Sequence, residues 1–305
     1  MTAARILYAA EGRLRAPWRL LAFALATVTG LLVAQAIAYS LASAPAGPLG
    51  TRLGAEMWLL TLALLIGHAL TLRLVDRRGW DAVALDRAAA RPRRLLLGLA
   101  VGVLAIAVPT AALIAVGWLR IAPAEPGSWW DAAWRLSVFL APAALWEELA
   151  FRGYPFAVLR EALGVAPALL ATSLLFGLIH LSNPGADGRS TALVVLAGVF
   201  LGVVLLATRS LYATWLAHLG WNWTMAVLFH AAVSGQPFPS PGYQTVDAGP
   251  DWATGGVWGP EGGAGAALGM TAGMLVLAAW RRPARGLLAV SALFARRPRR
   301  GEPYA

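Results

Sequence analysis

The chain has 305 residues, of which 59% are hydrophobic and only 13% are charged, and its mean hydropathy is +0.64. Soluble domains contain about 45–50% apolar and about 25% charged residues, so this composition excludes soluble, disordered and disulfide-rich classes and indicates a polytopic membrane protein. The net charge of +10 comes from arginines, and these arginines lie between the apolar segments. Their positions indicate loops that flank membrane helices, so we expect no nucleic-acid partner.

Eight segments are apolar and long enough to approach the roughly 20 residues of a transmembrane helix. In chain order they are 20–42, 55–74, 95–118, 132–152, 167–183, 191–208, 211–232 and 263–280. The fourth, fifth and seventh contain polar side chains. We therefore expect an all-α fold, a polytopic membrane bundle of about eight transmembrane helices, in one integral membrane domain over residues 1–305.

The arginines predict the orientation of this bundle. An even number of spans places both termini on one side of the membrane. If that side is cytosolic, all arginines are cytosolic except Arg52, Arg120, Arg135 and Arg189. Because cytosolic loops are enriched in positive charge, both termini are predicted to be cytosolic. Many alanines and arginines with no lysine favour a bacterial protein, hence the inner (plasma) membrane.

Two polar segments lie outside the predicted helices. Residues 233–262 are rich in Gly and Pro and form the long connection on the non-cytosolic side. We interpret them as a surface loop, with a lid over a cavity as the alternative. The tail 281–305 mixes leucines with arginines, which is typical of an interfacial helix on anionic lipid, so membrane lipid is an expected partner.

The fourth segment carries charged residues inside an apolar helix. Each such group at mid-membrane costs about 2.5–3.5 kcal/mol on insertion scales. Glu148 and Arg152 are four residues apart, so they share a helix face and can form an ion pair. Glu147 is rotated by about 100° from Glu148 and lacks that partner, which makes it a candidate functional group.

The fifth and seventh segments add polar side chains at a similar depth. His180 lies in the fifth segment, and His218 and Asn222 lie four residues apart in the seventh. Counted from cytosolic helix ends near Leu159 and Ala168, Glu147 and His180 lie roughly 18 Å deep. Asn222 lies roughly 16 Å deep and His218 roughly 10 Å by the same rule. These groups can therefore meet at one level of the membrane.

The residue types indicate hydrolysis of an amide bond within the membrane. A carboxylate and an imidazole can polarise a water into a nucleophile, and imidazole and amide N–H groups can stabilise an oxyanion. Two non-enzymatic alternatives use the same residues. One is a scaffold whose polar network holds helices together, and the other is a transporter with a proton relay through Glu147, Glu148 and the histidines.

Three ordered motifs resemble a known family. They are E-E-x-x-x-R (Glu147, Glu148, Arg152), F-x-x-x-H (Phe176, His180) and H-x-x-x-N (His218, Asn222). Together they are similar to the CPBP family (CAAX protease and bacteriocin-processing, also called Abi), whose members are intramembrane proteases. The motifs lie between residues 132 and 232, which we expect to be the catalytic core.

The resemblance implies roles for these side chains. By the family pattern, Glu147 and His180 activate the water. His218 and Asn222 stabilise the oxyanion. Glu148 and Arg152 support them. The implied activity is that of an intramembrane endopeptidase, similar to CAAX prenyl proteases, acting on a peptide or protein substrate.

Zinc dependence is the alternative chemistry. The chain has no cysteine and no H-E-x-x-H helix, so thiolate zinc sites and the usual zincin arrangement are excluded. Two histidines and a glutamate can nevertheless supply three zinc ligands. We expect metal-free catalysis without a cofactor by a glutamic-type protease, and a metalloprotease remains the alternative.

Overall fold

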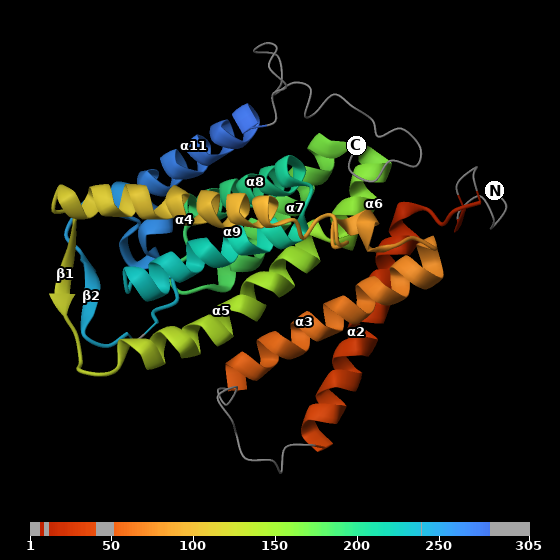
Figure 1. The fold of residues 1–305 in the computed structure, drawn as a ribbon, viewed down its shortest axis with the longest axis horizontal. Helices are drawn as coiled ribbons and strands as arrows, with labels where there is room; N and C mark the ends of the chain where they lie inside the picture. Colours follow the sequence, from red (N-terminus) through yellow and green to blue (C-terminus); the bar gives the residue numbers. More distant parts are fainter. Residues whose placement is uncertain (1–6, 9–11, 41–51, 239, 281–305) are drawn as a thin grey trace.

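The computed structural model describes residues 7–8, 12–40, 52–238 and 240–280 and consists mainly of long helices (Figure 1). The helices are α2 (Ala16–Ser40), α3 (Arg52–Leu70), α4 (Pro92–Ala115), α5 (Trp129–Arg152), α6 (Tyr154–Leu163), α7 (Val165–Ile179), α8 (Gly188–Thr208), α9 (Leu211–Trp223), α10 (Asp251–Thr254) and α11 (Ala264–Trp280). The strands are β1 (Leu119–Pro123) and β2 (Tyr243–Asp247). The predicted interfacial tail, 281–305, lies outside the described residues.

Each of the eight predicted segments contains a helix, namely α2, α3, α4, α5, α7, α8, α9 and α11. Within the described ranges, five stretches are apolar and long enough to cross a membrane: Ala16–Ile37, Gly54–Asp76, Pro92–Ala115, Val165–Ser182 and Gly188–Thr208. α11 is apolar but shorter. α5 carries the charged residues, and α9 continues into a π-helical turn at Thr224–Leu228. The predicted helical membrane bundle is confirmed, and the number of spans stays a prediction.

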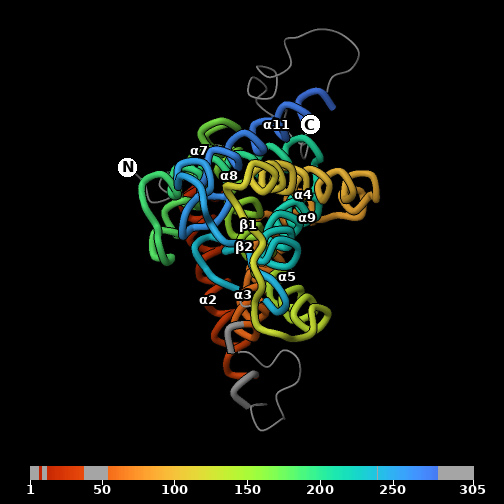
Figure 2. Tube along the Cα trace, turned by 90° about the vertical axis from the view of Figure 1, so that its left-hand side faces the viewer, coloured from red at the N-terminus to blue at the C-terminus, as the bar shows by residue number. Residues whose placement is uncertain are grey.

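α5 lies between the α2–α3 pair and the layer that contains α4 and α9 (Figures 1 and 2). α4 approaches α9 closely because Gly98 and Gly102 face the backbone of α9. A Cβ at these positions would lie 2.1 Å from the carbonyl oxygen of Ala213 and 2.0 Å from that of Ala217, respectively. The two glycines therefore allow α4 to fix the position of α9, which carries His218.

The chain breaks its helix directly after the charged residues of α5. α5 ends at Arg152, Gly153 follows, and α6 begins at Tyr154. The depth estimate that assumed a continuous helix to Leu159 is therefore wrong. Glu147 lies five residues before the end of α5, or about 8 Å along the helix axis.

His68 stabilises this break from α3. Its Nδ1 lies 2.7 Å from the backbone carbonyl of Leu64, and its Nε2 accepts a hydrogen bond of 2.9 Å from the backbone N–H of Tyr154. A Cβ at position 153 would lie 2.2 Å from the same Nε2, so glycine is required there. His68 is therefore a structural histidine that joins α3 to the start of α6.

The segment 233–262 is not a simple surface loop. Its strand β2 pairs antiparallel with β1, with Ile121 opposite Thr245, at the end of the molecule where α4 ends and α5 begins (Figure 1). It continues through α10, and the Trp258 side chain is buried. The sequence shows no alternating pattern strong enough to predict β1 and β2. Their pairing also joins segments about 120 residues apart, and such a distant contact cannot be located from local sequence.

Candidate active site

Glu148 connects α5 to α9. Its Oε1 accepts a hydrogen bond of 3.3 Å from Nη1 of Arg152 and lies 2.8 Å from Nδ1 of His218. The Glu148 side chain is 0% exposed and that of Arg152 is 1% exposed. Arg152 also donates through Nη2 to the backbone carbonyl of Gly198 in α8, at 3.0 Å. The ion pair predicted from the i, i+4 spacing is confirmed, and it is fully buried.

Glu147 lies on the other side of the same imidazole. Its Oε2 is 3.8 Å from Nε2 of His218, and this oxygen has no hydrogen-bond partner among the described residues. Because Glu148 binds Nδ1 of His218, Nε2 is directed toward Glu147. A separation of 3.8 Å is too long for a direct hydrogen bond, but it is within the range of an electrostatic contact between the two groups. His218 therefore contacts both glutamates.

Phe176 and His180 lie at the end of α7. Nδ1 of His180 is 2.7 Å from the backbone carbonyl oxygen of Phe176. A carbonyl oxygen only accepts, so Nδ1 carries a proton and the neutral ring presents Nε2 as an acceptor. Cζ of Arg152 lies 4.3 Å from the centroid of the Phe176 ring, a cation–π contact. The same ring is 4.8 Å from that of His180 and 6.0 Å from that of His218, so Phe176 packs against both histidines and Arg152.

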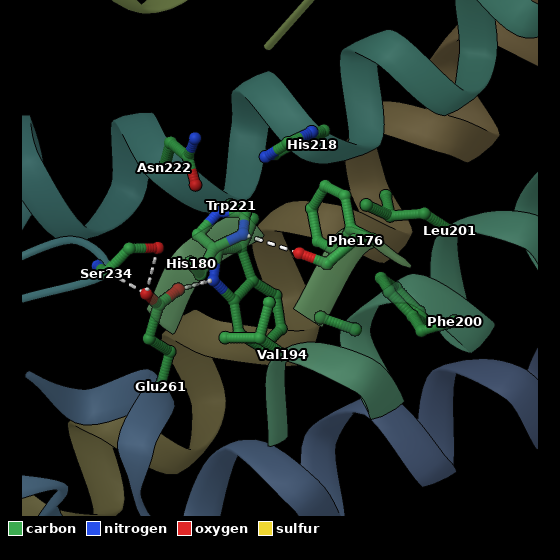
Figure 3. A pocket seen from close by; sticks show the side chains of 11 residues that line it. Phe176, His180, Val194, Phe200, Leu201, His218, Trp221, Asn222, Ser234 and Glu261 are labelled. Carbon is green, nitrogen blue, oxygen red and sulfur yellow. Dashed lines mark hydrogen bonds between the residues drawn. The ribbon is translucent and has the colours of Figure 1, made fainter. Parts of the chain in front are cut away.

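His180, His218 and Asn222 line one cavity between α7, α8 and α9, with about 400 Å³ of empty space (Figure 3). The rest of the wall is largely apolar and aromatic and includes Phe176, Val194, Ala197, Phe200, Leu201 and Trp221. The three charged residues of α5 are not among the lining residues. Glu148 lies against Nδ1 of His218 and Arg152 lies against the Phe176 ring, so these two support the cavity wall. Glu147 adjoins the cavity through Nε2 of His218, and the other three predicted site residues line it directly.

Two polar residues of the cavity wall were not predicted. Glu261 accepts hydrogen bonds from Nε1 of Trp221 at 2.9 Å, from Oγ of Ser234 at 2.7 Å and from the backbone N–H of Ser234 (Figure 3). Glu261 and Ser234 both come from the segment 233–262, which thus forms one side of the cavity. No helical or strand pattern surrounds Glu261 in the sequence, so only the fold reveals its position.

The two cavity histidines share one property that matters for metal or water binding. Each has its Nδ1 occupied, in His180 by a carbonyl and in His218 by a carboxylate, so Nε2 is the nitrogen left for a further partner. Among the residues that the structure describes, no three His, Asp or Glu side chains form a group that could hold a metal ion.

Residues 128–224, about a third of the chain, match the family described as Type II CAAX prenyl endopeptidase Rce1-like. The resemblance to the CPBP family is confirmed. The matched region runs from the start of α5 to the end of α9 and contains all six predicted site residues, whereas Glu261 lies outside it. This family implies a membrane protease with a peptide or protein substrate. No curated protein and no solved structure matches the chain.

Proposed function

We propose that the protein is an intramembrane endopeptidase that cleaves a peptide bond at the cavity of α7, α8 and α9. The observation that carries the proposal is the convergence of His180, His218 and Asn222 on this cavity, with Glu147 3.8 Å from His218. The apolar wall suits an apolar side chain of the substrate, which would leave the scissile carbonyl to the polar groups.

In this scheme Glu147 is the general base. It takes a proton from a water as the water oxygen attacks the carbonyl carbon, and His180 accepts a hydrogen bond from the same water through Nε2. The carbonyl oxygen becomes an oxyanion that accepts hydrogen bonds from the Asn222 amide and from Nε2–H of a protonated His218, whose Nδ1–H already donates to Glu148. Glu147 then returns the proton to the leaving nitrogen, and the C–N bond breaks. Glu148 holds the His218 ring in the required orientation.

The direct test is cleavage of a peptide library by the purified full-length protein. We expect the parent and a Glu125→Ala control, which changes an exposed glutamate outside the cavity, to produce the same fragments. Glu147→Ala is expected to produce none above background. Fragments of equal yield from Glu147→Ala would exclude the proposed base, and the scaffold or proton relay would then explain the polar residues better.

We propose that catalysis requires no metal. Metal analysis of the active purified protein should then show well under one equivalent of zinc, and a strong chelator should leave turnover unchanged. Stoichiometric zinc, with activity lost on chelation and restored by added zinc, would instead establish a metalloprotease that uses Nε2 of His180 and His218 as ligands.

We further propose that both termini are cytosolic, in a bacterial inner membrane. Reporter fusions after Arg87 and after Arg285 should both report the cytosol, and a fusion near Gly242 should report the opposite side. In Figure 1, β1, β2 and the start of α5 lie together at the end away from the start of α4, which supports opposite reporter signals near Gly242 and after Arg87. A cytosolic signal at Gly242 would contradict the eight-span topology.

A further inference from the structure

A second cavity lies at the start of α4 and shares no lining residue with the cavity between α7, α8 and α9. It is formed by the start of α4, the turn between α8 and α9, and the end of α11. It is open to solvent and has about 1010 Å³ of space between its walls and the solvent. Four of its lining residues are arginines, namely Arg91, Arg93, Arg94 and Arg209. Thr208 and Trp280 also line it. We call it the basic pocket.

Two of these arginines are held in place by neighbouring groups. Nη1 of Arg94 donates a hydrogen bond of 3.1 Å to the backbone carbonyl of Arg209, across 115 residues of sequence. Cζ of Arg93 lies 4.2 Å from the ring centroid of Trp280, a cation–π contact that orients the guanidinium. The pocket is therefore organised by contacts between α4, α11 and the turn after α8.

The backbone conformation at Arg209 restricts which residue can replace it. Arg209 caps α8 with a φ of 52°, in the left-handed region that glycine and asparagine adopt most easily. A large cationic residue at this position costs conformational energy.

The charges of the basic pocket are unbalanced among the described residues. No acidic residue lines it. Asp86 is close enough for its charge to act on Arg94, but its carboxylate also accepts the backbone N–H groups of Ala88 and Ala89. The guanidinium groups repel one another, and a bound anion would remove that repulsion. Planar guanidinium groups match the oxygens of a phosphate in two-pronged hydrogen bonds.

We propose that the basic pocket binds a phosphate group, supplied in the membrane by the headgroup of an anionic phospholipid. The pocket lies at the end of the bundle that the arginines predict to be cytosolic, and basic pockets between helices on that side suit anionic headgroups. Trp280 at its rim is a residue type enriched at the membrane interface. The proposal concerns binding only and does not depend on the protease activity.

The test compares two double variants of the full-length protein in a zwitterionic detergent. Arg94→Gln/Arg209→Asn removes two charges from the pocket, and asparagine tolerates the left-handed backbone at position 209. Arg73→Gln/Arg87→Gln removes two exposed arginines predicted to lie on the same side but outside the pocket. Thermal unfolding is followed while phosphatidylglycerol, phosphatidylcholine or inorganic phosphate is titrated.

We expect phosphatidylglycerol to raise the unfolding temperature of the parent more than phosphatidylcholine does. At about 1 kcal/mol for each arginine, or about fivefold in affinity, the pocket variant should need roughly 25-fold more phosphatidylglycerol for half of the effect. The control variant should lose several-fold less. If inorganic phosphate alone produces a shift that the pocket variant lacks, the phosphate site stands and the free anion is its ligand. Equal losses in both variants, or equal effects of the two lipids, would overturn the proposal.

Discussion

Glu147→Gln is expected to lower turnover by at least about 10²–10⁴-fold, the usual contribution of general acid–base catalysis. Glutamine has nearly the same shape but cannot take a proton from water, so the loss should appear in kcat with little change in folding. The 3.8 Å separation of Glu147 from Nε2 of His218 is not a direct hydrogen bond, so the substitution breaks no strong contact of the folded state. The measurement is steady-state kinetics on a peptide that the parent cleaves, with a thermal melt of each variant.

Asn222→Ala serves as the comparison within the same experiment. Loss of one oxyanion donor costs about 10²–10³-fold in kcat, and KM should stay nearly constant because the contact strengthens only in the transition state. Glu125→Gln is the matched control for Glu147→Gln, since it makes the same chemical change on an exposed glutamate. Near-normal turnover of both Glu147→Gln and Asn222→Ala would rule out the catalytic assignment and favour a purely structural polar network.

Glu148→Gln is expected to destabilise the protein as well as to inactivate it. The substitution leaves the Arg152 guanidinium, whose side chain is 1% exposed, without its counter-charge, and it weakens the bond that orients His218. Removal of one partner of a buried ion pair costs about 3–5 kcal/mol. The measurement is thermal unfolding in detergent beside peptide cleavage.

The double variant Glu148→Gln/Arg152→Met separates these two effects. Because it removes both buried charges, it should recover much of the stability that Glu148→Gln loses. Its activity should stay low, because His218 still lacks the Glu148 carboxylate. A Glu148→Gln protein that melts like the parent would show that the buried pair contributes little to stability, and recovery of activity in the double variant would argue against an orienting role for Glu148.

Local features of the sequence were sufficient to predict the helices and the family. Hydrophobicity over about 20 residues is a property of each segment by itself, so all eight segments could be located and each contains a helix. The Glu148–Arg152 pair was predictable for the same reason, since residues four apart on one helix are neighbours in any fold. The motifs likewise indicated a core over residues 132–232, and the match to the protease family covers residues 128–224.

Contacts between distant segments were decided only by the tertiary structure. The depth predicted for Glu147 was wrong, because the sequence did not predict the break after Arg152. The sequence also could not show that His218 lies between Glu147 and Glu148, because that depends on the rotation of α9 against α5. It also could not show that Glu261 reaches the cavity, because a segment rich in glycine has no periodicity that fixes a direction. Helix packing determines these contacts, and the close approach of α4 to α9 at Gly98 and Gly102 is one of its physical causes.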